Sequence, residues 1–127
     1  MHTVNTDRVL IVEQPDGREM LKLALELAGF EVDLAGTGEE GLLTAAVRTP
    51  AVVISDIDLP QMDGWQLAAA LRHQFGHAMR LVALTSRDDP DDRRRSATAG
   101  FDVHLVKPIS PHRVQSKLTQ LLDAADG

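Results

Sequence analysis

The segment Val52–Pro60, with the sequence VVISDIDLP, decides the fold class of this chain. It begins with three β-branched or apolar residues and continues into two aspartates and a proline. A short apolar run that is stopped by turn residues is typical of a strand buried on both faces, as in a parallel sheet. Asp56 directly follows this predicted strand. Because ligands bind at the carboxyl ends of strands in open α/β sheets, Asp56 is a candidate functional residue, and the alternative is a simple helix cap.

Strand patterns alternate with helical patterns along the whole chain. The strands are predicted at 8–12, 30–34, 52–54, 80–84 and 103–106, and a helix is predicted after each of them. Five strands that alternate with five helices predict an α/β fold. With right-handed crossovers, the simplest closure is a (βα)5 doubly wound, five-stranded parallel sheet of flavodoxin-like order 2-1-3-4-5, with helices on both faces.

Size and composition indicate one globular domain that spans residues 1–127. The formal net charge of −6 argues against non-specific nucleic-acid binding. The absence of cysteine excludes disulfide and thiolate chemistry. The sequence has no apolar run of membrane-spanning length and no signal-peptide core, so we expect a cytoplasmic protein that does not enter a membrane by itself.

Three helical segments give expectations that the structure can test. The spacing of Met20, Leu23, Ala24 and Leu27 predicts that these residues form the inward face of the first helix. Trp65, at the start of the third helix, is expected to be partly exposed.

The fourth helix, predicted from Asp91 to Ala99, has only two apolar residues, Ala97 and Ala99, so we expect it to be held weakly. Its Arg93–Arg95 run directly follows the acidic run Asp88–Asp92, which favours a self-neutralising surface helix over a nucleic-acid site.

Polar residues follow four of the five predicted strands. They are Glu13 and Gln14, then Asp56 and Asp58, then Thr85 and Ser86, and finally Lys107. Carboxylates with other oxygen groups suit a hard cation such as Mg²⁺, and a lysine with a hydroxyl suits phosphoryl oxygens. The spacing therefore predicts a Mg²⁺-dependent phosphoryl site at one edge of the sheet.

Asp56 with the segment LPQMDG at 59–64, Thr85 and Lys107-Pro108 resembles the receiver domain of bacterial two-component response regulators. The resemblance covers roughly residues 8–122, which we expect to form the core of the domain. It implies that Asp56 takes a phosphoryl group from a histidine kinase or a phosphotransfer protein. It also implies that Thr85 bonds one phosphoryl oxygen, that Lys107 pairs with another, and that the Lys107-Pro108 peptide bond is cis.

The same resemblance implies a Mg²⁺ site formed by Glu13, Gln14, Asp56 and the backbone carbonyl of Asp58. Glu13 and Gln14 stand where the family usually has two acids. An amide oxygen can bind a hard cation but brings no charge, so we expect weaker Mg²⁺ binding than an acid at position 14 would give.

Further positions are expected to tune the site. Arg87 is predicted to reach Asp58 across the mouth of the pocket, and this pair is expected to set the lifetime of the acyl phosphate. Ser86 is small enough to leave the site open. His104 stands where the family commonly has a tyrosine or phenylalanine that acts as a switch, and an ordinary strand histidine is the alternative. The stretch 100–108 resembles receivers attached to hybrid histidine kinases.

The resulting expectation is a phosphoacceptor receiver, not an enzyme that turns over an external substrate. It would catalyse its own phosphorylation and dephosphorylation and signal to an unknown protein, or form a homodimer, through its fourth helix, fifth strand and last helix. No output module follows, so the chain is expected to be a stand-alone receiver or a piece of a hybrid kinase or larger regulator.

Two alternatives stay open. Because Gln14 replaces an acid, the chain could be a pseudo-receiver that binds partners without phosphorylation. Asp56-Ile57-Asp58 also resembles the Asp-x-Asp motif of haloacid-dehalogenase-type phosphatases, although the further acids of that family are missing.

Overall fold

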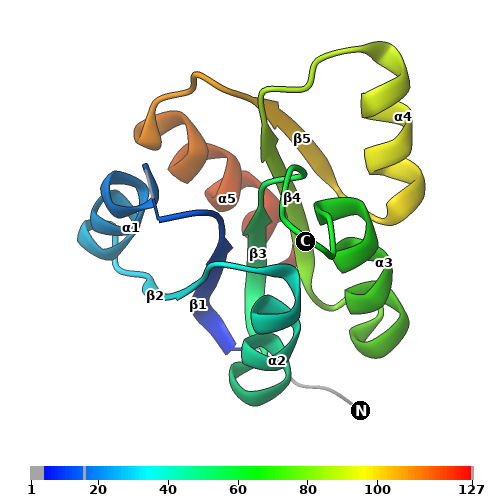
Figure 1. Cartoon of the computed structure of the whole chain (residues 1–127). Helices are drawn as coiled ribbons and strands as arrows, with labels where there is room; N and C mark the ends of the chain where they lie inside the picture. Colours follow the sequence, from blue (N-terminus) through cyan, green and yellow to red (C-terminus); the bar gives the residue numbers. More distant parts are fainter. Residues whose placement is uncertain (1–4, 16, 127) are drawn as a thin grey trace.

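Five parallel strands form one sheet in the order β2-β1-β3-β4-β5, which confirms the predicted flavodoxin-like order (Figure 1). The computed structural model describes residues 5–15 and 17–126. In chain order the elements are β1 (Asn5–Val12), α1 (Arg18–Leu27), β2 (Glu31–Ala35), α2 (Gly38–Arg48), β3 (Pro50–Ser55), α3 (Gly64–Phe75), β4 (Arg80–Thr85), α4 (Pro90–Ala99), β5 (Val103–Val106) and α5 (Pro111–Asp126). All six residues of the central strand β3 are buried, as the opening segment predicts. None of the helices described here combines the length and the hydropathy that crossing a membrane requires.

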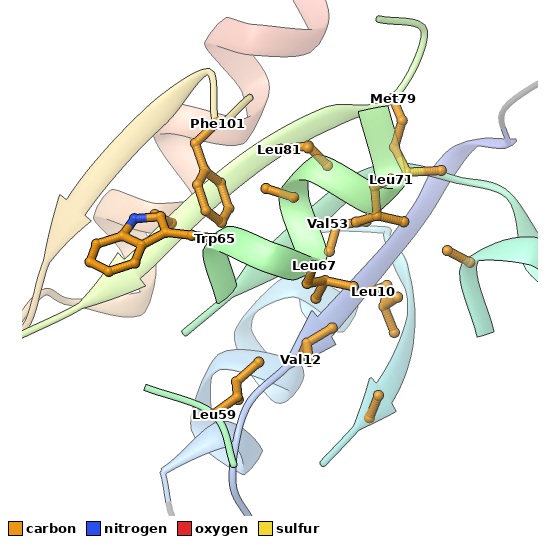
Figure 2. Packing of buried hydrophobic residues seen from close by; sticks show 14 of the residues in the cluster. Leu10, Val12, Val53, Leu59, Trp65, Leu67, Leu71, Met79, Leu81 and Phe101 are labelled. Carbon is orange, nitrogen blue, oxygen red and sulfur yellow. The ribbon is translucent and has the colours of Figure 1, made fainter. Parts of the chain in front are cut away.

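Helices cover both faces of the sheet, and each face has its own apolar core. Successive residues of a strand point to opposite faces, so Leu10 and Val12 enter one core while Val9 and Ile11 enter the other. The first core lies under α2 and α3 (Figure 2). The second lies under α1 and α5, which pack side by side (Figure 1). Helices therefore pack against both faces of the sheet, and the carboxyl ends of the strands lie along one of its edges.

Local sequence signals set the helix ends. The hydroxyl of Thr37 accepts a hydrogen bond from the Glu40 N–H at 3.1 Å and caps α2. Asp63 and Gln66 form a reciprocal capping box at the start of α3. α4 ends at Gly100, whose φ of 120° favours glycine. These residues therefore set the starts of α2 and α3 and the end of α4.

The predicted inward face of α1 is wrong. Its three largest members are exposed, Met20 by 66%, Leu23 by 51% and Leu27 by 80%, whereas Leu21 and Leu25 are buried. Apolar residues cover more than half of the circumference of this helix, so more than one stripe fits the helical period. Packing against α5 and β2 buries Leu21 and Leu25, and neither neighbour is visible in the local pattern.

Trp65 is also placed differently from the prediction, since it is only 8% exposed. Figure 2 shows its indole beside Phe101 at one end of the first core. The N–H of the indole donates to the hydroxyl of Ser96 in α4 at 3.0 Å. Contact with α4, a neighbour distant in sequence, buries this side chain.

α4 has the polar character that its sequence predicts. Among its described residues, Ser96 alone is buried. Arg93 pairs with Asp88 at 2.7 Å, and Arg94 pairs with Asp91. This pairing confirms a self-neutralising surface helix.

Candidate functional site

The carboxyl ends of β1, β3, β4 and β5 meet at one edge of the sheet. In the register of the parallel sheet, Val12 of β1 is paired with Ser55 of β3, Ser55 with Ala83 of β4, and Thr85 of β4 with Val106 of β5. Two backbone hydrogen bonds extend this alignment past the strands, from the N–H of Asp56 to the carbonyl of Val12 at 3.0 Å and from the N–H of Lys107 to the carbonyl of Thr85 at 2.8 Å. The residues that follow these strands therefore converge, as the sequence predicts.

Glu13, Asp56 and Lys107 form the centre of this edge. The ammonium nitrogen of Lys107 lies 3.2 Å from Oδ2 of Asp56, and it also forms an ion pair with Oε1 of Glu13. The side chain of Glu13 is 10% exposed and that of Asp56 15%, against 34% for Lys107. Two largely buried carboxylates thus share one lysine that still reaches solvent.

The two carboxylates control the charge state of Lys107. Partial burial by itself lowers the pKa of the ammonium group. The hydrogen bond to Glu13 and the charge of Asp56 outweigh this effect, so the pKa of Lys107 is raised above its ordinary value. Lys107 is therefore a permanent cation at neutral pH and can offset negative charge that arrives at Asp56.

The loop after β3 fixes the other oxygen of Asp56. The backbone N–H of Asp58 donates to Oδ1 of Asp56 at 3.1 Å. Gly64 packs directly beneath this loop, and a Cβ there would lie 2.3 Å from the carbonyl oxygen of Asp56. The N–H of Gly64 also donates to the carbonyl of Ile57 at 2.8 Å. Only glycine permits this close approach, which explains physically why the LPQMDG segment ends in glycine.

Thr85 and Ser86 lie beside the centre, at the end of β4. Thr85 is fully buried, and its hydroxyl oxygen accepts a hydrogen bond from the N–H of Arg87 at 3.3 Å. A hydroxyl that accepts in this way still has its own proton to donate. Ser86 is exposed. Thr85 therefore has the chemistry to bond an incoming oxygen atom.

The predicted pair across the mouth is present. The guanidinium of Arg87 lies 2.8 Å from Oδ1 of Asp58 and 3.5 Å from Oδ1 of Asp92. The hydrogen bond that Arg87 donates to the Asp58 carboxylate, together with the negative charge of that carboxylate, raises the pKa of Arg87. Both partners are about half exposed, 43% for Arg87 and 50% for Asp58. The pair lies where solvent meets the site.

The donor set fits a hard cation with few protein ligands. Within residues 5–15 and 17–126, no group of three or more His, Cys, Asp or Glu side chains is arranged to hold a metal ion. Glu13 and Asp56 nevertheless supply two carboxylates that lie close together, since both form an ion pair with the ammonium group of Lys107. Gln14 is exposed and neutral. Mg²⁺ usually binds proteins through one or two carboxylates and keeps several waters, and the pair Glu13 and Asp56 fits this ligand set.

His104 is held by both ring nitrogens. Nδ1 lies 2.8 Å from the hydroxyl oxygen of Ser96, and Nε2 lies 2.7 Å from the carbonyl oxygen of Arg87. Its proposed role as a switch stays a prediction. The Lys107-Pro108 peptide bond is cis, as the resemblance implies. Sequence reasoning missed Ser96 and Trp65, because no motif links a serine on a polar helix to an indole 31 residues away.

Comparisons with known proteins agree on one family. The model described as "Response regulator receiver domain" matches residues 9–119. The transcriptional regulatory protein PcoR of Escherichia coli is 35% identical over 120 residues, which are 93% of this chain and 52% of PcoR. This chain spans about half the length of most of the curated relatives that it matches.

Solved structures give the same result. A CheY-like response regulator receiver domain protein from Methanospirillum hungatei has a TM-score of 0.89 at 28% identity, covering 96% of this chain and 98% of that one. The receiver domain of sensor histidine kinase PA1611 from Pseudomonas aeruginosa, described with a magnesium ion coordinated in its active site cleft, has a TM-score of 0.84 at 25% identity. That match covers 94% of this chain and 99% of the other.

Proposed function

This chain belongs to the family of response regulator receiver domains, and we propose on that basis that Asp56 accepts a phosphoryl group from a histidine kinase or a phosphotransfer protein. The observation that carries the proposal is the contact of Lys107 with both Asp56 and Glu13. It places a fixed positive charge beside the carboxylate that would receive the phosphoryl group.

The proposed step is a nucleophilic transfer. A carboxylate oxygen of Asp56 attacks phosphorus, the bond from phosphorus to the imidazole nitrogen of the donor breaks, and an acyl phosphate forms. The phosphoryl oxygens are stabilised by the ammonium of Lys107 and by the hydroxyl proton of Thr85. Water attack on the same acyl phosphate would return the carboxylate and release inorganic phosphate. This cycle involves no external metabolite, so the protein is proposed to act as a switch and not as an enzyme.

The residues of the site would hold Mg²⁺ through Glu13, Asp56 and the backbone carbonyl of Asp58, with Gln14 as a neutral ligand. When bound, the ion supplies positive charge to the phosphoryl oxygens. The magnesium ion described for the PA1611 receiver domain supports this assignment. Binding is proposed to be weaker than with an acid at position 14.

Signalling is proposed to run through the face formed by α4, β5 and α5, toward a downstream protein or a second copy of the chain. Gln14 favours one competing function, a pseudo-receiver that binds partners without phosphorylation, because it removes a charge that would hold the metal. The Asp-nucleophile phosphatase is the other competitor.

Incubation with acetyl phosphate and Mg²⁺, followed by intact-mass analysis, separates these functions. A receiver gains one phosphoryl group, and Asp56→Asn abolishes the gain. A pseudo-receiver gains none and binds no Mg²⁺ in calorimetry. A phosphatase instead releases product from a chromogenic phosphate ester, and this activity requires Asp58 as well as Asp56.

A further inference from the structure

A closed ring of contacts joins the mouth of the site to α4, and Arg87 belongs to it through both its side chain and its backbone. At one end, its guanidinium lies over the ring of Trp65, 5.4 Å from the centroid. At the other end, its backbone carbonyl accepts a hydrogen bond from Nε2 of His104 at 2.7 Å. Ser96 of α4 closes the ring between Trp65 and His104.

The hydrogen atoms in this ring have one consistent arrangement. The indole N–H of Trp65 can only donate, so the hydroxyl oxygen of Ser96 accepts it at 3.0 Å. The carbonyl of Arg87 can only accept, so Nε2 of His104 carries a proton. With the imidazole neutral, Nδ1 accepts the hydroxyl proton of Ser96 across 2.8 Å. Each of the polar atoms that form the ring is thereby satisfied.

α4 depends on these contacts for its attachment. Ser96 is its single buried residue among those described, and the hydroxyl contacts both Trp65 and His104. The guanidinium of the neighbouring Arg95 stacks on the Trp65 ring, 3.7 Å from its centroid. Asp92, in the first turn of α4, lies 3.5 Å from the guanidinium of Arg87. Polar and cation–π contacts, more than apolar burial, therefore hold α4 on the domain.

The ring is connected directly to the site. The backbone N–H of Arg87 donates to the Thr85 hydroxyl, and its side chain pairs with Asp58. The backbone N–H of Asp58 in turn donates to the carboxylate of Asp56. Arg87 is therefore one contact away from Asp58 and Thr85, and Asp58 is one contact away from Asp56.

We propose that Arg87 is a positioning residue that transmits the state of the site mouth to α4 through Trp65 and His104. Asp58 holds the guanidinium over the indole, and the indole holds Ser96. A phosphoryl group on Asp56 adds negative charge beside Asp58 and claims the Thr85 hydroxyl, so Arg87 moves toward the site and α4 is loosened. The trigger rests on the proposed function, whereas the ring and its hold on α4 stand without it.

The first experiment needs no phosphorylation. Trp65 is the only tryptophan of the chain and there is no tyrosine, so its emission reports this ring alone. Arg87→Ala and Asp58→Asn are compared with Arg94→Ala, which removes an exposed arginine of α4 that pairs only with Asp91 among the ion pairs of the described residues. If the ring holds α4, Arg87→Ala and Asp58→Asn should both change the Trp65 emission relative to wild type. In both variants amide exchange in α4 should be at least about threefold faster than in wild type, and exchange in α3 should be unchanged. If both variants match Arg94→Ala in these readouts, the positioning role of Arg87 is wrong.

The second experiment tests the trigger. Wild type and Arg87→Ala are treated with acetyl phosphate and Mg²⁺ and compared at equal phosphoryl occupancy, measured by intact mass. The wild type should change its Trp65 emission and lose protection in α4, and Arg87→Ala should show neither response. An equal response in both proteins contradicts transmission through Arg87. If the wild type gains no phosphoryl group, the proposed function fails, and the first experiment alone decides the positioning role.

Discussion

The ammonium nitrogen of Lys107 lies 3.2 Å from Oδ2 of Asp56, although 51 positions separate the two residues in the sequence. The same nitrogen forms an ion pair with Glu13, which is almost completely buried. One lysine directly after β5 therefore balances two carboxylates, which directly follow β1 and β3. Because one cation offsets two carboxylates, the site is sensitive to each of its charges.

Replacing Lys107 by methionine should destabilise the domain by about 1–2 kcal/mol, because it leaves two largely buried carboxylates without the cation that they share. The value is below that of a fully buried pair, since Lys107 keeps contact with solvent. Urea unfolding at pH 7 in EDTA checks the prediction. Mg²⁺ should restore more stability to Lys107→Met than to wild type. An equal response of both proteins to Mg²⁺ would contradict a shared position for the lysine and the metal.

The Lys107 contribution should also depend on pH. Because the pKa of Lys107 is raised in the folded protein, the stabilisation is fully present below the ordinary pKa of the lysine. It should be lost as pH rises through the raised value. The stability difference between wild type and Lys107→Met should therefore be constant from pH 7 to 9 and should shrink only at higher pH. A difference that shrinks already at pH 8 would be inconsistent with the ion pair.

Replacing Gln14 by aspartate should strengthen Mg²⁺ binding about tenfold, since a third carboxylate then faces the cation. Isothermal titration calorimetry of wild type and variant measures the difference. Gln14→Ala is the matched control and should bind Mg²⁺ no more tightly than wild type. Equal affinities for wild type and Gln14→Asp would show that position 14 does not contribute to the metal site.

Asp58 and Arg87 should act as a unit on the lifetime of the acyl phosphate. Dephosphorylation rates of Asp58→Ala, Arg87→Ala and the double variant form a mutant cycle. We expect a coupling energy of about 0.5–1 kcal/mol, as for a half-exposed ion pair with good geometry. Additive effects of the two substitutions would mean that the pair observed across the mouth does not control water attack.

Replacing Ser96 by alanine should destabilise the domain by about 1–3 kcal/mol, because it leaves the buried N–H of Trp65 and Nδ1 of His104 without their shared partner. Thr98→Ala is the control, since Thr98 is exposed on the same helix. Its unfolding free energy should stay within about 0.5 kcal/mol of wild type. The idea that Ser96 anchors α4 is wrong if the two substitutions cost the same.

Sequence reasoning predicted the sheet order and the convergence of Glu13, Asp56, Thr85 and Lys107. It succeeded because the order of elements restricts the topology, and parallel strands bring their carboxyl ends to one edge. The pair between Asp58 and Arg87 followed from the same logic, since both residues lie two positions beyond site residues at that edge.

The failures concern contacts between helices. The sequence could not separate the buried stripe of α1, Leu21 and Leu25, from the exposed apolar stripe. Every residue of this helix that is not charged is apolar, so two stripes fit the helical period equally well. The burial of Trp65 depends on Ser96 and Arg95 of α4, a helix whose own pattern contains almost no apolar signal. Such contacts are fixed by tertiary packing and leave no periodicity in the sequence.

The central claim is that Asp56, and no other carboxylate of the site, carries the phosphoryl group. Treatment with acetyl phosphate and Mg²⁺, reduction of the acyl phosphate with borohydride and peptide mapping by mass spectrometry locate the modified residue. The structure predicts that Asp56 alone is converted to homoserine, because it is the carboxylate held by both Lys107 and the N–H of Asp58. Conversion of Asp58 or Glu13 in place of Asp56, or no conversion at all, would contradict the account.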